Sequence, residues 1–255
     1  MNLTLYPLEG LPLVTPGDDL PALITDTLTQ NDLSLQNGDV LVVAQKIVSK
    51  AEGRLVNLTT VKPSEAALDY GRMSDKDPRL VELILSESRE VLRVRKNLII
   101  VEHHLGFISA NAGVDHSNVS GPWGDAKDWV LLLPKNPDAS AAHIRHKLEE
   151  KFGVRIGVLI IDSHGRAWRL GTIGMTIGLS GLPGLVDLRG EPDLFDYRLR
   201  VTQVAASDEL AAGASLVMGQ AREGRPLVLA RGFPYPLREG CLSELLRPKE
   251  ADLFR

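Results

Sequence analysis

The chain has 255 residues, of which 44% are hydrophobic and 24% are charged, as in an ordinary soluble globular protein. Its formal net charge of −4 argues against a nucleic-acid partner, which a strongly basic face would bind. The single cysteine, Cys241, excludes an internal disulfide and suits a reducing compartment. The amino terminus lacks a signal pattern, and no apolar run nears the roughly 18 residues of a membrane helix. We therefore expect a cytoplasmic protein that binds neither membrane nor nucleic acid.

The first part of the chain predicts a strand at 3–6, a helix at 19–29 and a buried strand at 40–44. Two lysines, Lys46 and Lys50, follow the buried strand directly. They could meet anionic groups of a ligand, or they could form a solvated edge.

The next segment predicts two helices and a strand pair. Ser64 is expected to cap the first helix, and the second helix covers 80–88. Strands at 91–95 and 98–101 are expected to pair around a turn at Lys96-Asn97.

A polar cluster then follows an apolar stretch and contains Asp115 and Asn118. Three residues apart, these two would face the same way on a helical turn, where a carboxylate and a carboxamide suit a cation or a nucleotide. An Asx-rich turn is an equally good interpretation.

A second polar cluster begins where the apolar run 156–161 stops at Asp162, with Ser163, Arg166 and Arg169 close behind. The run predicts a buried strand, so Asp162 is expected at its carboxyl end, where open sheets place chemistry. A carboxylate beside a hydroxyl can hold a hard divalent cation, and arginines can hold phosphate or carboxylate. The alternative is that Asp162 or Ser163 caps a turn or a helix.

The glycine-rich stretch 171–184 matches neither a P-loop nor a Rossmann fingerprint, so its glycines are expected to permit close packing or tight turns. The other expected elements are a strand at 130–134, a helix beginning at Pro137, a half-buried strand at 199–205, a helix at 208–218 ended by Gly219, a strand at 227–230 and a polar helix near the C-terminus.

Several chemistries lack their motifs. No His-Glu-x-x-His pair or Cys/His array indicates zinc, no Gly-x-Ser-x-Gly elbow indicates a serine hydrolase, and Cys241 has no basic neighbour that would activate its thiol. The oxygen-bearing side chains and arginines instead favour a magnesium or manganese nucleotide site.

Six ordered segments resemble those of one known family. They are Leu8-Glu-Gly-Leu-Pro-Leu13, Gly38-Asp-Val-Leu-Val-Val43 with Ile47-Val-Ser-Lys-Ala-Glu-Gly-Arg54, Asn111-Ala-Gly-Val-Asp-His-Ser-Asn118, Leu131-Leu-Leu-Pro-Lys-Asn-Pro-Asp-Ala-Ser140, Ile160-Ile-Asp-Ser-His-Gly-Arg166 and Met218-Gly-Gln220. Over about residues 3–235 the chain resembles the coenzyme F420-0:L-glutamate ligase (gamma-glutamyl ligase) family. We expect the stand-alone form, without the nitroreductase-like domain of longer relatives.

The resemblance implies a ligase that depends on GTP and a divalent metal and adds L-glutamate, one or more through gamma linkages, to coenzyme F420-0. The GTP γ-phosphate would activate the acceptor carboxylate as an acyl phosphate, which the glutamate amine would attack. Mn²⁺ or Mg²⁺, expected as two ions, would bridge phosphate oxygens, and K⁺ is a further candidate ion.

The resemblance also implies site residues. The implied metal ligands are Asp115, Asp162, Ser163 (often Thr in the family) and Gln220 (Glu in some members). The implied GTP-binding residues are Leu11, Pro12, Leu13, Val14, Gln45, Lys46, Lys50, Asn118, Met218, Gly219, Gln220, Ala221, Arg222, Glu223, Gly224 and Arg225, with Gln45-Lys46 departing from the Ser-Thr of some members. The candidate catalytic residues are Asp162, Arg166 and Arg169, of which the arginines are chosen because their forks suit an anionic acceptor or the transferring phosphate.

The implied fold is mixed α/β (α+β), with two lobes in an intertwined homodimer. A ligase domain would cover 1–240, and a helical tail 241–255. Periodicity alone indicates only a mixture of α and β. Other functions stay open: a metal-dependent phosphohydrolase, a gamma-glutamyl ligase for another carboxylate such as a folate, and a non-catalytic nucleotide-binding regulator.

Overall fold

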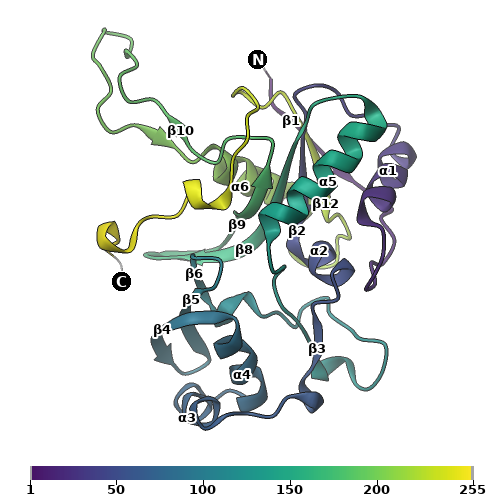
Figure 1. Ribbon diagram of the computed structural model, residues 1–255, viewed down its shortest axis with the longest axis vertical. Coiled ribbons are helices and arrows are strands. Elements are labelled where there is room, and N and C mark those ends of the chain that lie inside the picture. The colour runs from purple at the N-terminus through teal and green to yellow at the C-terminus, as the bar shows by residue number, and fades with distance from the viewer. Residues whose placement is uncertain (1, 254–255) are drawn as a thin grey trace.

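The computed structural model describes residues 2–253 and shows a mixed α/β fold with two lobes (Figure 1). The larger lobe is built on a five-stranded sheet in the order β1-β12-β2-β8-β9. These strands are β1 (Thr4–Leu8), β12 (Leu227–Arg231), β2 (Val40–Ala44), β8 (Gly157–Arg166) and β9 (Arg169–Ser180). The mixture of α and β expected from periodicity and the two lobes implied by the resemblance are both confirmed.

Strand β12 lies between β1 and β2, although it comes late in the sequence. Leu227 is opposite both Leu8 of β1 and Val43 of β2, and both pairings are antiparallel. Strand β2 is parallel to β8, with Ala44 opposite Ile161. Pro7, which was expected to end the first strand, lies inside β1, because an edge strand can accommodate a residue that has no N–H to donate.

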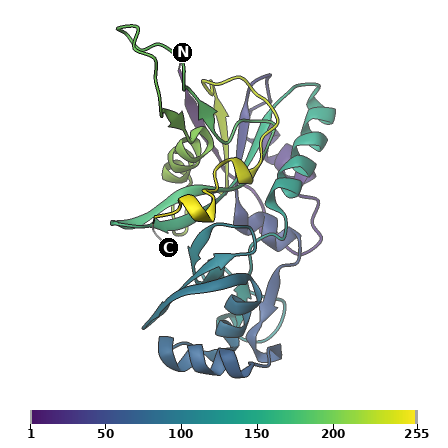
Figure 2. The same cartoon turned by 60° about the vertical axis from the view of Figure 1, so that its left-hand side comes forward.

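Helices cover both faces of this sheet, with α6 on one side and α1 and α5 on the other (Figure 2). The bounds are α1 (Leu20–Gln30), α5 (Pro137–Phe152) and α6 (Ala206–Met218). A Cβ on Gly174 of β9 would lie 2.5 Å from the Ala211 carbonyl oxygen of α6, and one on Gly178 would lie 2.3 Å from the Pro137 side chain of α5. The prediction that these glycines permit close packing is therefore confirmed. Within residues 2–253, no helix combines the length and apolar character needed to cross a membrane.

The smaller lobe lies below the larger one in Figure 1 and has its own core, which includes Val81, Ile84, Ile99 and Val101. Its elements are β3 (Leu55–Asn57), α3 (Glu65–Ser74), α4 (Pro78–Ser86), β4 (Ser88–Arg95), β5 (Leu98–His103), β6 (Ile108–Ala110) and β7 (Trp129–Leu131). Strands β4, β5 and β6 form one antiparallel sheet, and β3 pairs with β7. The predicted hairpin around Lys96-Asn97 is confirmed, as is the cap of α3 by Ser64, whose hydroxyl accepts from the Ala67 N–H.

A long arm projects from the larger lobe between β10 (Val186–Asp187) and β11 (Gln203–Val204) (Figure 1). Backbone hydrogen bonds such as Gly190 N–H to the Leu199 carbonyl join its two sides. The strand expected at 199–205 is wrong in extent, because this segment leaves the sheet and only its last part pairs as a strand.

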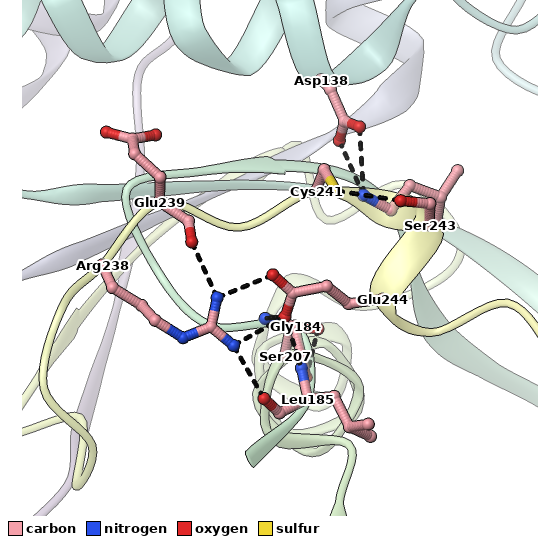
Figure 3. A network of polar contacts seen from close by, with 10 residues as sticks. Asp138, Gly184, Leu185, Ser207, Arg238, Glu239, Cys241, Ser243 and Glu244 are labelled. Carbon is pink, nitrogen blue, oxygen red and sulfur yellow. Dashed lines mark hydrogen bonds and ion pairs between the residues drawn. The ribbon is translucent and has the colours of Figure 1, made fainter. Parts of the chain in front are cut away.

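The C-terminal segment runs back across the larger lobe and is fixed by carboxylates (Figure 3). Glu244 accepts hydrogen bonds from the Gly184 and Leu185 N–H groups and forms an ion pair with Arg238, while Asp138 accepts from the Leu242 N–H. In place of the expected polar helix, the described part of 241–255 contains two 3₁₀ turns, Leu242–Glu244 and Lys249–Ala251. Pro248 between them explains this, because proline interrupts helical hydrogen bonding.

Candidate functional site

A cavity of about 620 Å³ opens beside the end of β2. Its walls come from α2 (Gln45–Ala51), the middle of β8, the loop after α6 and the segment around Asn118. It is lined by Leu13, Ala44, Gln45, Lys46, Ile47, Lys50, Asn118, Val119, Ser120, Ile161, Asp162, Ser163, Ser215 and residues 218–226. Segments far apart in the sequence, including most of those with proposed site residues, therefore meet at one place.

Asp162 does not stand at the end of its own strand, as was expected. Strand β8 continues to Arg166, because it forms a hairpin with β9 in which Arg166 is opposite Arg169. The shorter parallel neighbour β2 does end at this level, since its last residue, Ala44, is opposite Ile161. Asp162 thus projects where β2 stops and α2 begins, and this leaves room for the cavity.

Ser163 and Gln220 are joined directly although they are distant in sequence. The Ser163 hydroxyl donates to Gln220 Oε1 at 2.7 Å, and Gln220 Nε2 donates to Ser215 Oγ of α6 at 2.9 Å. The second bond fixes the amide so that its oxygen faces Ser163. Ser215 was not singled out from the sequence; its signal would have been a hydroxyl one turn before the end of α6, in the half of the helix that is otherwise apolar.

Lys46 and Lys50 lie on one face of α2, four residues apart, and both line the cavity. Lys50 Nζ donates to the Asn118 carbonyl oxygen, and within residues 2–253 no ion pair to a carboxylate is found for it. Burial, followed by the positive charge of Lys46, lowers the pKa of Lys50 below its ordinary value. Two like charges on one helix face repel each other, so a bound anion would stabilise this arrangement.

Asp115 lies behind Lys46 and does not line the cavity. Its Oδ2 is 2.7 Å from Lys46 Nζ, and its Oδ1 accepts hydrogen bonds from the backbone N–H and the hydroxyl of Ser117. Burial opposes ionisation of Asp115, yet the bonds from Lys46 and Ser117 outweigh burial and lower its pKa. The helical-turn interpretation of Asp115 and Asn118 is wrong, because the side chain of Asp115 closes an Asx turn and Asn118 has a φ of 55°.

The loop after α6 closes the remaining side of the cavity. Gly219 ends the helix with a φ of 77°, as was expected of a glycine at that position. Glu223 accepts from the Ala221 N–H, and Asn118 Nδ2 donates to the Ala221 carbonyl at 3.0 Å. Arg225 forms an ion pair with Glu9.

Five other residues proposed from the sequence lie outside the cavity lining. Arg166 and Arg169 stand near the tip of the β8–β9 hairpin. Leu11, Pro12 and Val14 do not line the cavity, although their neighbour Leu13 does, and Val14 packs in the core of the larger lobe. The cavity also has apolar lining residues that were not proposed as site residues, including Ile47, Val119 and Ile161.

Comparison with known proteins identifies the family. Residues 10–232 match the model of the family described as F420-0:Gamma-glutamyl ligase. A protein from Methanothermobacter thermautotrophicus named coenzyme F420:L-glutamate ligase is 46% identical over 257 residues, which cover all of both chains. Proteins of the same name are 44% identical in Methanopyrus kandleri, over 97% of each chain, and 44% identical in Methanocaldococcus jannaschii, over 87% of this chain and 86% of that one. The chain therefore belongs to the F420-0:gamma-glutamyl ligase family and is an enzyme of the ligase class.

Proposed function

We propose that this enzyme joins L-glutamate to coenzyme F420-0, with one or more glutamates added through gamma linkages, and uses GTP and a divalent metal ion. The observation that carries the proposal is the composition of the cavity. It sets oxygen-bearing side chains (Asp162, Ser163 and Gln220) together with two lysines, Lys46 and Lys50. The name shared by the relatives supports the choice of acceptor and amino acid.

The oxygen-bearing side chains fit a hard divalent cation. A carboxylate (Asp162), a hydroxyl (Ser163) and an amide oxygen (Gln220) line the cavity, with the last two 2.7 Å apart. Within residues 2–253, no group of three or more His, Cys, Asp or Glu side chains is arranged to hold a metal. An ion here would therefore take further oxygens from water and phosphate, which is how Mg²⁺ is held in many phosphoryl-transfer enzymes. Asp115 could join the set only by giving up its pairing with Lys46.

The proposed ligation has two chemical steps, and different side chains would serve each of them. In the first, an acceptor carboxylate oxygen bonds to the GTP γ-phosphorus as the bond to GDP breaks; in the second, the glutamate amine forms the amide and releases phosphate and a proton. Lys46 and Lys50 would hold the phosphates, and a bound Mn²⁺ or Mg²⁺ would neutralise charge on their oxygens. Arg166 and Arg169 lie beyond the cavity, so of the two tasks considered for them we assign them the anionic acceptor.

A mass-spectrometric assay tests the function directly. Purified enzyme is incubated with coenzyme F420-0, L-glutamate, GTP and Mn²⁺ in a potassium buffer, and parallel reactions contain ATP or a folate. We expect the precursor to gain mass in glutamyl units, with GTP-dependent release of phosphate. GTP hydrolysis without a mass shift would instead indicate a phosphohydrolase, a glutamylated folate would indicate another acceptor, and bound nucleotide without turnover would indicate a regulator.

Replacing Lys50 by Ala is expected to raise the KM for GTP about tenfold, because the variant loses a charge-assisted hydrogen bond to phosphate. Initial rates over a range of GTP concentrations measure this effect. Lys50→Arg should recover part of the affinity, and Lys151→Ala, at an exposed position of α5, is the matched control. An unchanged KM for GTP in Lys50→Ala would indicate that Lys50 does not bind the nucleotide and belongs to a solvated edge.

We also propose that the enzyme is a homodimer in which the projecting arm contacts a second copy. Leu194 is 97% exposed and Phe195 is 89% exposed at the arm, and Val201 is exposed as well. Such large apolar side chains gathered on one projection indicate a protein contact. The β8–β9 hairpin also carries exposed Trp168 and Leu170, which gives a second copy an apolar surface to receive the arm.

Phe195→Asp is expected to shift the protein from dimer to monomer, because a charge at the arm would oppose burial in an interface. Light scattering after gel filtration measures the molar mass. Met73→Asp, at an exposed position of α3 in the smaller lobe, is the matched control and should remain dimeric. A Phe195→Asp variant with the mass of the parent would show that the arm has another task.

A further inference from the structure

A buried histidine stands against the carboxylate that faces the cavity. His164 and Asp162 are two residues apart on β8, and His164 Nε2 is 3.0 Å from Asp162 Oδ2. The His164 residue is only 7% exposed, and its Nε2 has no well-aligned hydrogen bond inside residues 2–253. A buried polar nitrogen without a partner is costly, so a small rotation of the Asp162 carboxylate that aligns this contact is favourable.

The His164 ring is held in place from the side of the smaller lobe. Phe107, in the turn between β5 and β6, packs into the core of the larger lobe, and its ring centroid is 5.1 Å from that of His164. On its other side Phe107 stacks on His103, with centroids 5.2 Å apart and planes 14° apart. The imidazole of His164 is therefore wedged between the smaller lobe and Asp162, and this restricts the rotation of its ring.

We propose that His164 is a positioning residue, which donates from Nε2 to Asp162 Oδ2 and so leaves the other carboxylate oxygen, Oδ1, for a cation in the cavity. The inference rests on the proposed function, in that Asp162 is taken as a metal ligand. A ligand carboxylate whose second oxygen is bound to a buried donor loses less freedom when it coordinates an ion. Outer partners of this kind typically change metal affinity by about 10–100-fold.

The test measures Mn²⁺ binding by calorimetry in the presence of GDP, so that its readout does not depend on turnover. His164→Phe keeps a ring against Phe107 but removes the donor, and we expect its Mn²⁺ affinity to fall about tenfold. His164→Gln keeps an N–H donor near the same place and should recover most of that loss. His103→Phe alters the opposite face of Phe107 without touching Asp162, and its Mn²⁺ affinity should equal that of the parent even if its melting temperature falls.

Each outcome separates the inference from the function on which it rests. Weaker binding in His164→Phe with recovery in His164→Gln supports the positioning role. If the parent binds Mn²⁺, Asp162→Asn does not and His164→Phe binds normally, the positioning role is refuted while the metal assignment stands. If the parent itself binds no Mn²⁺, both fall. An equal loss in His164→Phe, His164→Gln and His103→Phe would show that His164 only packs between the lobes.

Discussion

Replacing Asp162 by Ala is expected to abolish glutamate ligation, a loss of about a thousandfold or more in kcat/KM, while the protein stays folded. The variant would lose the one carboxylate among the proposed oxygen ligands that line the cavity, and metal stabilisation of phosphoryl transfer is worth several kcal/mol. The change removes a charge at the start of the hairpin extension and leaves the apolar run of β8 intact. The mass-spectrometric assay, together with thermal unfolding, measures both parts of this expectation.

Two further variants make the Asp162 result specific. Asp162→Asn keeps the shape of the side chain and should be nearly as inactive, because the missing property is charge. Asp69→Ala removes an exposed carboxylate from α3 of the smaller lobe, where it pairs with Arg72, and should be as active as the parent. Substantial ligation by Asp162→Asn would contradict the assignment of the Asp162 carboxylate as a metal ligand.

The second large effect concerns pH. Burial lowers the pKa of His103 from 6.5 to about 4, and the charges of His104, His164, Arg54 and Arg89 act in the same direction. Between pH 6.5 and 4, His103 is therefore protonated in the unfolded chain but largely neutral in the folded chain. The stabilisation from neutral His103 is complete above pH 6.5 and is lost as the pH falls towards 4. The loss amounts to about 3 kcal/mol in the free energy of unfolding.

Urea unfolding of the parent and of His103→Phe, at several pH values from 7 to 4.5, measures this contribution. The Phe variant should lose less stability on acidification, because it has no imidazole to protonate at this place, while it keeps an aromatic ring against Phe107. His143→Gln, at an exposed position of α5, is the control and should follow the parent. Parallel pH profiles for parent and His103→Phe would show that His103 has the same pKa in the folded and the unfolded chain and does not contribute to acid sensitivity.

Much of the fold was predictable, because local signals agreed with the tertiary structure. The buried strands at 40–44 and 227–230 and the helix at 208–218 were correctly predicted, since most of their apolar side chains pack in the core of the larger lobe. The segment 199–205 misled because it alternates like a half-buried strand, yet it belongs to a projecting arm. Periodicity shows how apolar residues are spaced along the chain, but it does not show which part of the protein, if any, buries them.

The sequence predicted which residues belong to the candidate site better than it predicted how their side chains are arranged. Motif order indicated Ser163 and Gln220, which are 57 residues apart. The sequence did not indicate that Ser215 orients the Gln220 amide toward Ser163. Asp115 illustrates the opposite case, because its position in a motif indicated a metal ligand while Lys46 and Ser117 already occupy its oxygens. Lys46 and Ser117 compete with a metal ion for Asp115 only in the folded chain, so this competition cannot be predicted from the sequence around Asp115.

The place of β12 between β1 and β2 has a consequence for how the protein is made. During translation, β1 leaves the ribosome with its hydrogen-bonding edge unmatched, since its partner β12 begins only at Leu227. At roughly 5–20 residues per second, that partner arrives on the order of ten seconds or more later. A nascent chain stalled before Leu227 would lack the strand that joins β1 to β2. Premature termination should therefore yield a product for proteolysis rather than a working fragment.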